Sequence, residues 1–280
     1  MIKNWELQYF DLLKECFDEG IEKPCRGGTT QKTILDKRIV VDLSKEFPLL
    51  TTREINFDYV VYELIWILKG DTNIKYLQQN KVPIWNNFAD NNGEIGPVYQ
   101  WRSWLSDGIV TDQLAIVIEE IKANPYSKRL IVNSWDPSKL DKMSLPPCPF
   151  CFEFWVLNGK LNCIVNQRSA DALLGMPYDI ALYALLTAIV ANITDLKLGN
   201  LYHRVSDFQI YKEHEPKLRE LQKITVQPSP KLILKSKIAN IDQFQKSDVE
   251  LSEYHPQSKI TGKPAIGELF NYSARSTYQN

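Results

Sequence analysis

The fold is decided by residues 167–186, which read Gln167-Arg-Ser-Ala-Asp-Ala-Leu-Leu-Gly-Met-Pro-Tyr-Asp-Ile-Ala-Leu-Tyr-Ala-Leu-Leu186. After the proline at position 177 the sequence is almost continuously apolar, which predicts a long buried helix at about 178–194. The apolar run contains Asn192 and is flanked by Asp179 and Asp195, so we interpret it as a core helix and not as a membrane span.

A hairpin is expected immediately before this stretch. Residues 152–156 and 161–165 are strand-like and flank Asn158-Gly159, a strong signal for a two-residue turn. A hairpin followed by a long buried helix favours the α+β class, with a mainly antiparallel sheet covered by helices.

The same patterns extend outward along the chain. Apolar residues recur at helical spacing, and other segments read as strands. The expected helices are 5–19, 57–69 and 111–123, and the expected strands are 129–135, 201–210 and 231–236. With no repeat, low-complexity tract or linker, residues 1–280 are predicted to form a single catalytic domain with an irregular C-terminal tail from about residue 265.

Composition excludes several classes of protein. Apolar residues make up 44% and charged residues 24% of the 280 residues, which is typical of a globular protein. A net charge of -1 gives no reason to expect binding to nucleic acid or to a membrane surface. The first residues contain no apolar signal segment, and five irregularly spaced cysteines fit a reduced protein, so we expect a cytoplasmic location.

Two cysteines lie in Cys148-Pro-Phe-Cys151, a pattern also found in redox proteins. Redox chemistry requires the first cysteine at a helix N-terminus, whereas a hairpin is expected here. The three histidines lack metal-ligand spacing and Cys163 lies in a predicted strand, so no metal is expected. We interpret Cys151 as a small buried residue, whereas Cys148 lies on a predicted turn just before a strand.

Several ordered motifs together resemble the thymidylate synthase family, and the resemblance extends over nearly the whole chain. The motifs are Glu63-Leu-Ile-Trp-Ile-Leu-Lys-Gly70, Ile84-Trp85, Gly96-Pro-Val-Tyr99-Gln-Trp-Arg102, Ser127-Lys128-Arg129, Leu145-Pro-Pro-Cys148, residues 167–186 and Ser206-Asp207-Phe-Gln209-Ile-Tyr211.

The resemblance implies covalent catalysis on a pyrimidine. A Cys148 thiolate would add to C6, which makes C5 nucleophilic toward 5,10-methylenetetrahydrofolate, and Arg168 beside it would favour the thiolate. Tyr99 matches the tyrosine implicated in removal of the C5 proton, and Glu63 matches the glutamate that organises water and proton transfer. The alternative to an enzyme is a non-catalytic relative of the family that only binds a nucleotide or RNA.

The resemblance also assigns binding roles. Trp85, Asp171 and Gly175 match positions at the folate, with the aspartate holding the pterin. A phosphate needs permanently charged donors, and Arg26, Arg168 and Ser169 match residues that supply them. Lys128 and Arg129 match a pair that reaches the site of the partner subunit, which implies a symmetric homodimer formed through the sheet.

Asp179 departs from the synthase pattern, in which asparagine contacts uracil. A carboxylate cannot donate to uracil O4 but can accept from the 4-amino group of cytosine. Within the family, aspartate here is typical of cytidylate hydroxymethylases and methylases, so Asp179 predicts a cytosine nucleotide.

Departures also occur at the sugar and at the C-terminus. Gln209 replaces the histidine that, with the tyrosine matched by Tyr211, contacts the ribose, which favours CMP over dCMP. The tail after Ile266 replaces a short apolar terminus that closes the site over folate, and a changed lid favours hydration of the intermediate. We therefore expect a 5-hydroxymethyl product, with C5-methylation of dCMP or dUMP as the alternative.

Overall fold

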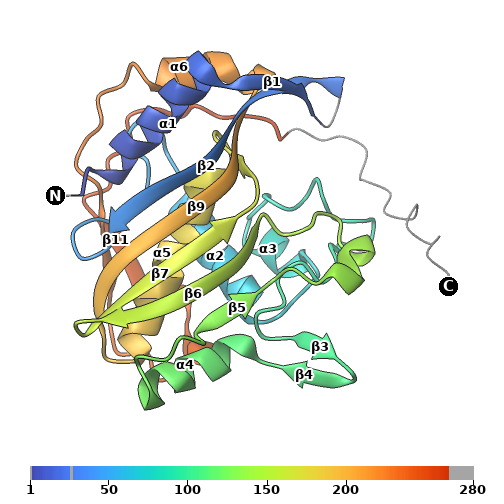
Figure 1. The fold of residues 1–280 in the computed structure, drawn as a ribbon, viewed down its shortest axis with the longest axis vertical. Helices are drawn as coiled ribbons and strands as arrows, with labels where there is room; N and C mark the ends of the chain where they lie inside the picture. The colour runs from blue at the N-terminus through green and yellow to red at the C-terminus, as the bar shows by residue number, and fades with distance from the viewer. Residues whose placement is uncertain (1, 26–27, 265–280) are drawn as a thin grey trace.

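The computed structural model describes residues 2–25 and 28–264, and this part of the chain is built on a seven-stranded sheet (Figure 1). All neighbouring strands are antiparallel except that β7 and β8 run parallel to β9. The order across the sheet is β1 (Ile21–Pro24), β2 (Thr30–Asp42), β9 (Lys197–Tyr211), β7 (Lys160–Gln167), β6 (Pro149–Leu157) and β5 (Ile131–Asn133), with β8 (Ala170–Asp171) also pairing with β9.

The parallel pairing follows from the connection between β7 and β9. Helix α5 (Gly175–Ile193) crosses over between them, as a parallel connection requires. Strand β8 continues the pairing of β7 with β9, because Gln167 of β7 pairs with Val205 and Ala170 of β8 pairs with Phe208. The expected hairpin is confirmed as β6 and β7, and the α+β class with a mainly antiparallel sheet is confirmed as well.

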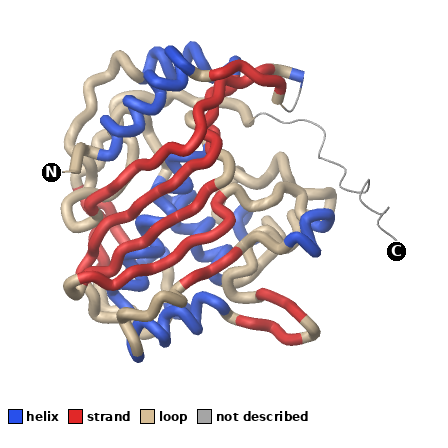
Figure 2. The backbone as a smooth tube through the Cα atoms, viewed as in Figure 1, coloured by secondary structure: helices blue, strands red, loops and turns tan. Residues whose placement is uncertain are grey.

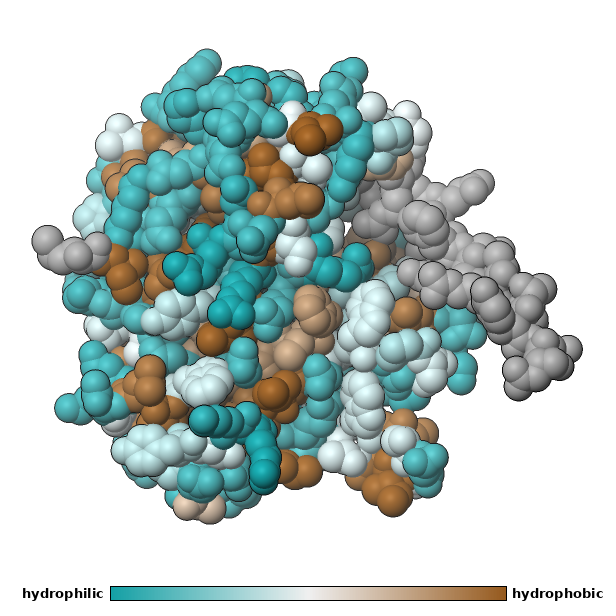
Figure 3. All heavy atoms as spheres, in the orientation of Figure 1, coloured by the Kyte–Doolittle hydropathy of each residue, from teal (hydrophilic) through white to brown (hydrophobic). Residues whose placement is uncertain are grey.

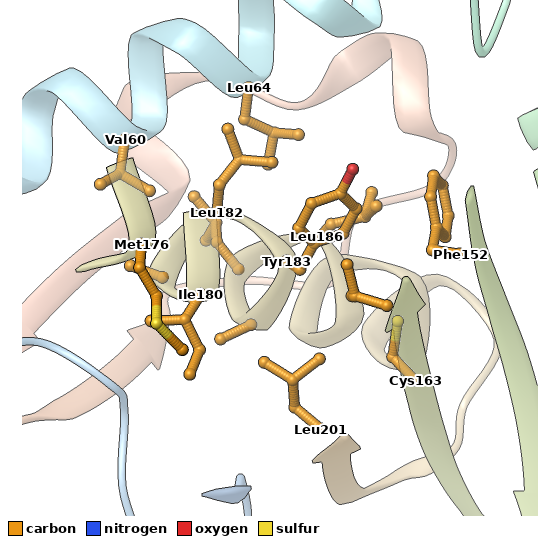
Figure 4. Packing of buried hydrophobic residues seen from close by; sticks show 14 of the residues in the cluster. Val60, Leu64, Phe152, Cys163, Met176, Ile180, Leu182, Tyr183, Leu186 and Leu201 are labelled. Carbon is orange, nitrogen blue, oxygen red and sulfur yellow. The ribbon is translucent and has the colours of Figure 1, made fainter. Parts of the chain in front are cut away.

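Helix α5 forms the centre of the hydrophobic core. It is long and apolar enough to cross a membrane, but most of its residues are buried inside the protein, so it is a core helix as expected. Figure 4 shows Val60 and Leu64 of α2 (Phe57–Leu68) on one side of α5 and Cys163 and Leu201 of the sheet on the other. Pro177 lies in its first turn, where a proline costs no helical hydrogen bond, so the helix begins three residues earlier than predicted.

The other predicted elements agree with the structure to different degrees. Helices α1 (Trp5–Glu19), α2 and α4 (Gln113–Ala123) agree closely with the prediction. The strand expected at 231–236 is not part of the central sheet, because β10 (Lys231–Leu234) pairs with β11 (Val249–Ser252). The helices not predicted are α3 (Lys75–Gln79) and α6 (Glu215–Leu221). The strands not predicted are β1, β2, β8, β11 and the short hairpin β3 (Trp104–Ser106) and β4 (Ile109–Thr111).

The two faces of the sheet differ. Helices α2 and α5 lie behind it, whereas in the described chain no helix crosses the face turned toward the viewer in Figure 2. Trp155, Ile164 and Tyr202 lie half-buried on this open face, together with the exposed Arg38 and Arg204. Figure 3 shows hydrophobic and hydrophilic side chains interspersed across it. The open face therefore carries half-buried apolar side chains that no helix of the described chain covers.

Candidate active site

Cys148 lies directly before β6, and Arg168 lies directly after the neighbouring β7. The Arg168 amide N–H donates to the Cys148 carbonyl at 2.8 Å, while its guanidinium donates to the carbonyls of Pro146 at 2.7 Å and Pro147 at 3.0 Å. Nη2 of Arg168 lies 3.9 Å from Cys148 Sγ, and the guanidinium lies 5.5 Å from the centre of the Trp135 ring. Arg168 therefore fixes the turn that carries the thiol and places a positive charge beside its sulfur.

Cys151 is oriented differently. It lies within β6, paired with Asn133 and Asn166, and is half-buried on the open face, so the expectation of full burial is wrong. Burial raises the pKa of its thiol, which makes it a poor nucleophile. A strand follows Cys148, so the helix N-terminus needed for the redox alternative is not present at this cysteine.

Glu63 is buried on α2 and accepts a hydrogen bond from the indole N–H of Trp85 at 2.8 Å. Burial and, to a smaller extent, the negative charge of Asp179 raise the pKa of Glu63 to about 8 against the lowering effect of the Trp85 hydrogen bond. The carboxyl group is therefore protonated at neutral pH and can donate or accept a proton near that pH.

Tyr99 lies where the candidate catalytic groups converge. Its ring contacts Trp85 edge-on, with centroids 6.1 Å apart. Burial raises the pKa of its hydroxyl well above the ordinary value, and the charges of Glu63, Asp179 and Cys148 raise it further. Side chains from α2, α5 and the turn before β6 therefore all raise the pKa of the Tyr99 hydroxyl, as expected if they share one active site.

Asp179 lies near the start of α5, facing the end of β7. Its Oδ2 accepts from the Gln167 side-chain amide at 2.7 Å. Burial raises the pKa of Asp179 to about 7, the Gln167 hydrogen bond lowers it, and the charge of Asp171 raises it. Asp179 is therefore poised to exchange a proton near neutral pH.

Asp171 precedes the same helix and contacts the C-terminal segment through a histidine. Its Oδ1 accepts from the backbone N–H groups of Leu173 at 2.9 Å and Leu174 at 3.3 Å, and lies 3.5 Å from Nδ1 of His214. Nε2 of His214 lies 2.8 Å from the Lys263 carbonyl. The pKa of His214 is raised, because the carboxylate of Asp171 outweighs the effect of burial.

Gly175 separates the two carboxyl groups. A methyl group at this position would lie 3.6 Å from Cβ of Asp171 and 3.7 Å from Oδ2 of Asp179. Position 175 therefore lies within van der Waals reach of both a candidate folate-binding group and a candidate base-binding group.

Gln209 and Tyr211 lie buried at the end of β9, joined by a third residue. Nε2 of Gln31, on β2, donates to Oε1 of Gln209 at 2.7 Å, and Nε2 of Gln209 donates to the Tyr211 hydroxyl at 3.2 Å. The two predicted sugar-binding residues therefore belong to one polar chain.

The predicted phosphate-binding residues do not all come together. Arg26 lies outside the described residues. Lys128 and Arg129 are exposed, and the adjacent carbonyl of Leu130 accepts from the Phe154 amide, six residues along β6 from Cys148. At about 3.3 Å per residue this places the pair roughly 20 Å from the thiol of the same chain. Ser169 is half-buried beside Arg168.

Four residues of the site carried no predicted role: Gln31, Gln167, His203 and His214. Gln167 lies within the most informative stretch, and the two histidines attracted attention only as metal ligands. The signal in the sequence that could have identified these residues is a polar side chain within an otherwise apolar strand, because a buried polar group needs a hydrogen-bond partner.

Comparison with known proteins identifies one family. The family model described as thymidylate synthase matches residues 7–266 of the chain. The match includes every candidate residue named above, from Arg26 to Lys263. Within residues 2–25 and 28–264, no group of three or more His, Cys, Asp or Glu side chains could hold a metal ion.

Proposed function

Because the chain belongs to the thymidylate synthase family, whose members transfer a one-carbon unit from 5,10-methylenetetrahydrofolate to C5 of a pyrimidine nucleotide, we propose that its substrate is a cytosine nucleotide. The proposed product is the 5-hydroxymethyl nucleotide of CMP or dCMP, with CMP preferred. The proposal rests on a single observation, the environment of the Asp179 carboxyl group.

One oxygen of Asp179 accepts from Gln167, and the pKa of the group is raised to about 7. As a carboxylate it accepts from the 4-amino group of cytosine but has no hydrogen for uracil O4. In its protonated form it can give a proton to N3 of cytosine, which accepts one. A donor and acceptor mismatch in a closed site costs about 1–3 kcal/mol per group, enough to select one base.

The covalent steps require charges that these residues can supply. Cys148 adds to C6 as the proton of Asp179 moves to N3, so that C5 becomes an enamine carbon. Bound methylenetetrahydrofolate supplies the electrophilic carbon. After C5 bonds to this carbon, the C5 proton leaves to water held by the Tyr99 hydroxyl, which keeps its own proton, and tetrahydrofolate departs to leave an exocyclic methylene group. Water held by Glu63 would then add to that methylene carbon, and the Cys148 thiolate leaves C6 as N3 returns its proton to Asp179.

The folate fits the residues around Asp171. Gly175 lies against both Asp171 and Asp179, and the rings of Trp85 and Tyr99 contact one another edge-on. Asp171 would hold the pterin through its carboxylate, which Leu173 and Leu174 already orient through their amide N–H groups.

We further propose a homodimer formed through the open face. Its half-buried aromatic and aliphatic residues support this, as does the separation of Lys128 and Arg129 from Cys148 of their own chain. In a symmetric dimer these two cations would bind the phosphate in the partner site, together with Arg26, Arg168 and Ser169 of that site.

The test is mass spectrometry of the products formed from methylenetetrahydrofolate and an equimolar mixture of CMP, dCMP, UMP and dUMP. Gain of CH2O on a cytosine nucleotide supports the proposal and identifies the sugar. Gain of CH2 alone, with the appearance of dihydrofolate, identifies the alternative methylase. Reaction confined to uracil nucleotides refutes cytosine specificity.

A further inference from the structure

A buried hydrogen-bond chain runs from His203 on β9 through Gln167 on β7 to Asp179 on α5. Nε2 of His203 lies 2.5 Å from Oε1 of Gln167. Nε2 of Gln167 lies 2.7 Å from Oδ2 of Asp179 and 2.9 Å from the Ser169 carbonyl oxygen. His203 and Gln167 are 0% and 1% exposed, so water does not compete for these contacts.

The carbonyl of Ser169 fixes the orientation of the Gln167 amide. A backbone carbonyl only accepts, so the atom 2.9 Å from it is the NH2 group of Gln167, and the amide oxygen must face His203. Nε2 of His203 therefore carries the hydrogen. The reversed amide would point its oxygen at two acceptors, the Ser169 carbonyl and the Asp179 carboxyl group.

The protonation state of His203 agrees with this assignment. Burial lowers the pKa of its imidazole to about 3, so the ring is neutral and carries one N–H. Nδ1 has no hydrogen-bond partner among the described residues, which leaves Nε2 as the nitrogen that makes a contact. The ring is a fixed donor to Gln167 throughout the pH range of enzyme activity.

We propose that Gln167 and His203 are positioning residues that set base specificity, because they occupy Oδ2 of Asp179 with a donor and leave Oδ1 to address the nucleotide base. The proposal rests on the contact between Asp179 and the base proposed above. An aspartate free to rotate could present either oxygen, with or without its proton, and would discriminate less between cytosine and uracil.

Other groups near Asp179 do not supply this orientation. Asp171 interacts with it as a negative charge, and the pKa values of Glu63, Tyr99 and Tyr183 are raised by its charge. Among the described residues, the side-chain amide of Gln167 donates the hydrogen bond that Asp179 accepts.

The experiment measures the dissociation constant for UMP divided by that for CMP, by calorimetry and without folate, so that a higher ratio means a stronger preference for CMP. His203→Phe fills the core and removes the donor, whereas His203→Gln keeps an N–H at similar reach. We expect the ratio to fall roughly tenfold in His203→Phe and to be largely retained in His203→Gln. An unchanged ratio in folded His203→Phe protein overturns the proposal.

A second variant covers the case in which His203→Phe does not fold. Gln167→Met keeps the length of the side chain but cannot donate, so the same tenfold fall is expected, and an unchanged ratio again overturns the proposal. If the wild-type protein prefers UMP, the proposed cytosine specificity is wrong. The positioning role of Gln167 and His203 is then tested by whether the two variants lose the preference for UMP.

Discussion

Trp85 donates its indole N–H to Oε1 of Glu63 at 2.8 Å, and this contact holds a buried carboxyl group between α2 and the loop after α3. Burial raises the pKa of Glu63 from 4.5 to about 8. A raised carboxyl pKa means that the folded protein binds a proton which the unfolded chain releases above pH 4.5. Retaining the ionisable group at position 63 therefore costs stability as the pH rises from 4.5 to 8.

Glu63→Gln removes this cost while keeping an oxygen for Trp85 to bind. We expect the free energy of unfolding to exceed that of wild type by about 4 kcal/mol at pH 8 and to equal it below pH 4. Activity should fall by about 100-fold or more, because the residue can no longer transfer a proton. Urea denaturation at both pH values measures the first effect, and an equal difference at both would show that ionisation is not its cause.

Asp179→Asn should shift the base preference from cytosine toward uracil. The asparagine amide can donate to uracil O4 and accept from N3–H, whereas it has no proton to release to cytosine N3. We expect the ratio of kcat/KM for CMP over UMP to fall by about 100-fold. Activity that needs protonated Asp179 should decline above pH 7 in wild type, and the variant should lack that decline.

Asp171→Asn provides the matched control for this change. It alters a neighbouring carboxyl group that is assigned to folate, so it should raise KM for methylenetetrahydrofolate and leave the base preference in place. A loss of preference in both variants would indicate a general effect of charge near α5 and would contradict a specific contact between Asp179 and the base.

Local patterns predicted the hairpin of β6 and β7 and helix α5, whereas β2, which pairs with β9 along most of its length, was not predicted. The Asn158-Gly159 turn and the apolar run of α5 act over a few residues, so the sequence reveals them directly. The β3 and β4 strands have three residues each, too few for a period to emerge. Strand β10 was predicted, but its pairing with β11 depends on residues about 20 positions away, which no local pattern specifies.

The site shows the same division between local and distant information. Cys148, Asp171 and Asp179 follow from motifs, and their assigned roles remain predictions. The partners of these residues do not follow from motifs, because Gln167 reaches His203 across 36 positions and Gln31 reaches Gln209 across 178. Such contacts form only when β2, β7 and β9 lie side by side, so they required the structure.

Gln31 should control binding of the sugar through Gln209. Gln31→Leu removes the donor to the Gln209 amide, which leaves a buried carbonyl unsatisfied and the amide free to rotate. We expect KM for CMP to rise about tenfold with a smaller change in kcat, and the preference between CMP and dCMP to weaken. Steady-state kinetics with both nucleotides measures these effects.

Gln31→Glu tests whether orientation, rather than packing, is responsible. A carboxylate at this position attracts the NH2 group of Gln209, which turns the amide oxygen toward the Tyr211 hydroxyl and reverses the polarity of the chain. The two variants should therefore differ in their preference between CMP and dCMP. Identical kinetics in both would attribute the effect to lost packing alone.

Arg129 should act in the active site of the partner subunit, because its own chain holds it about six residues along β6 from Cys148. Cys148→Ser and Arg129→Ala should each be nearly inactive. In a heterodimer of the two variants, one site combines an intact Cys148 with Arg129 of the partner subunit. Refolding an equal mixture should therefore restore up to about one quarter of wild-type activity.

A mixture of Cys148→Ser with Arg168→Ala is the matched control, since Arg168 contacts Cys148 within one chain and no heterodimer site is complete. Recovery in neither mixture, with dimers seen by sedimentation, would place Arg129 outside the catalytic site.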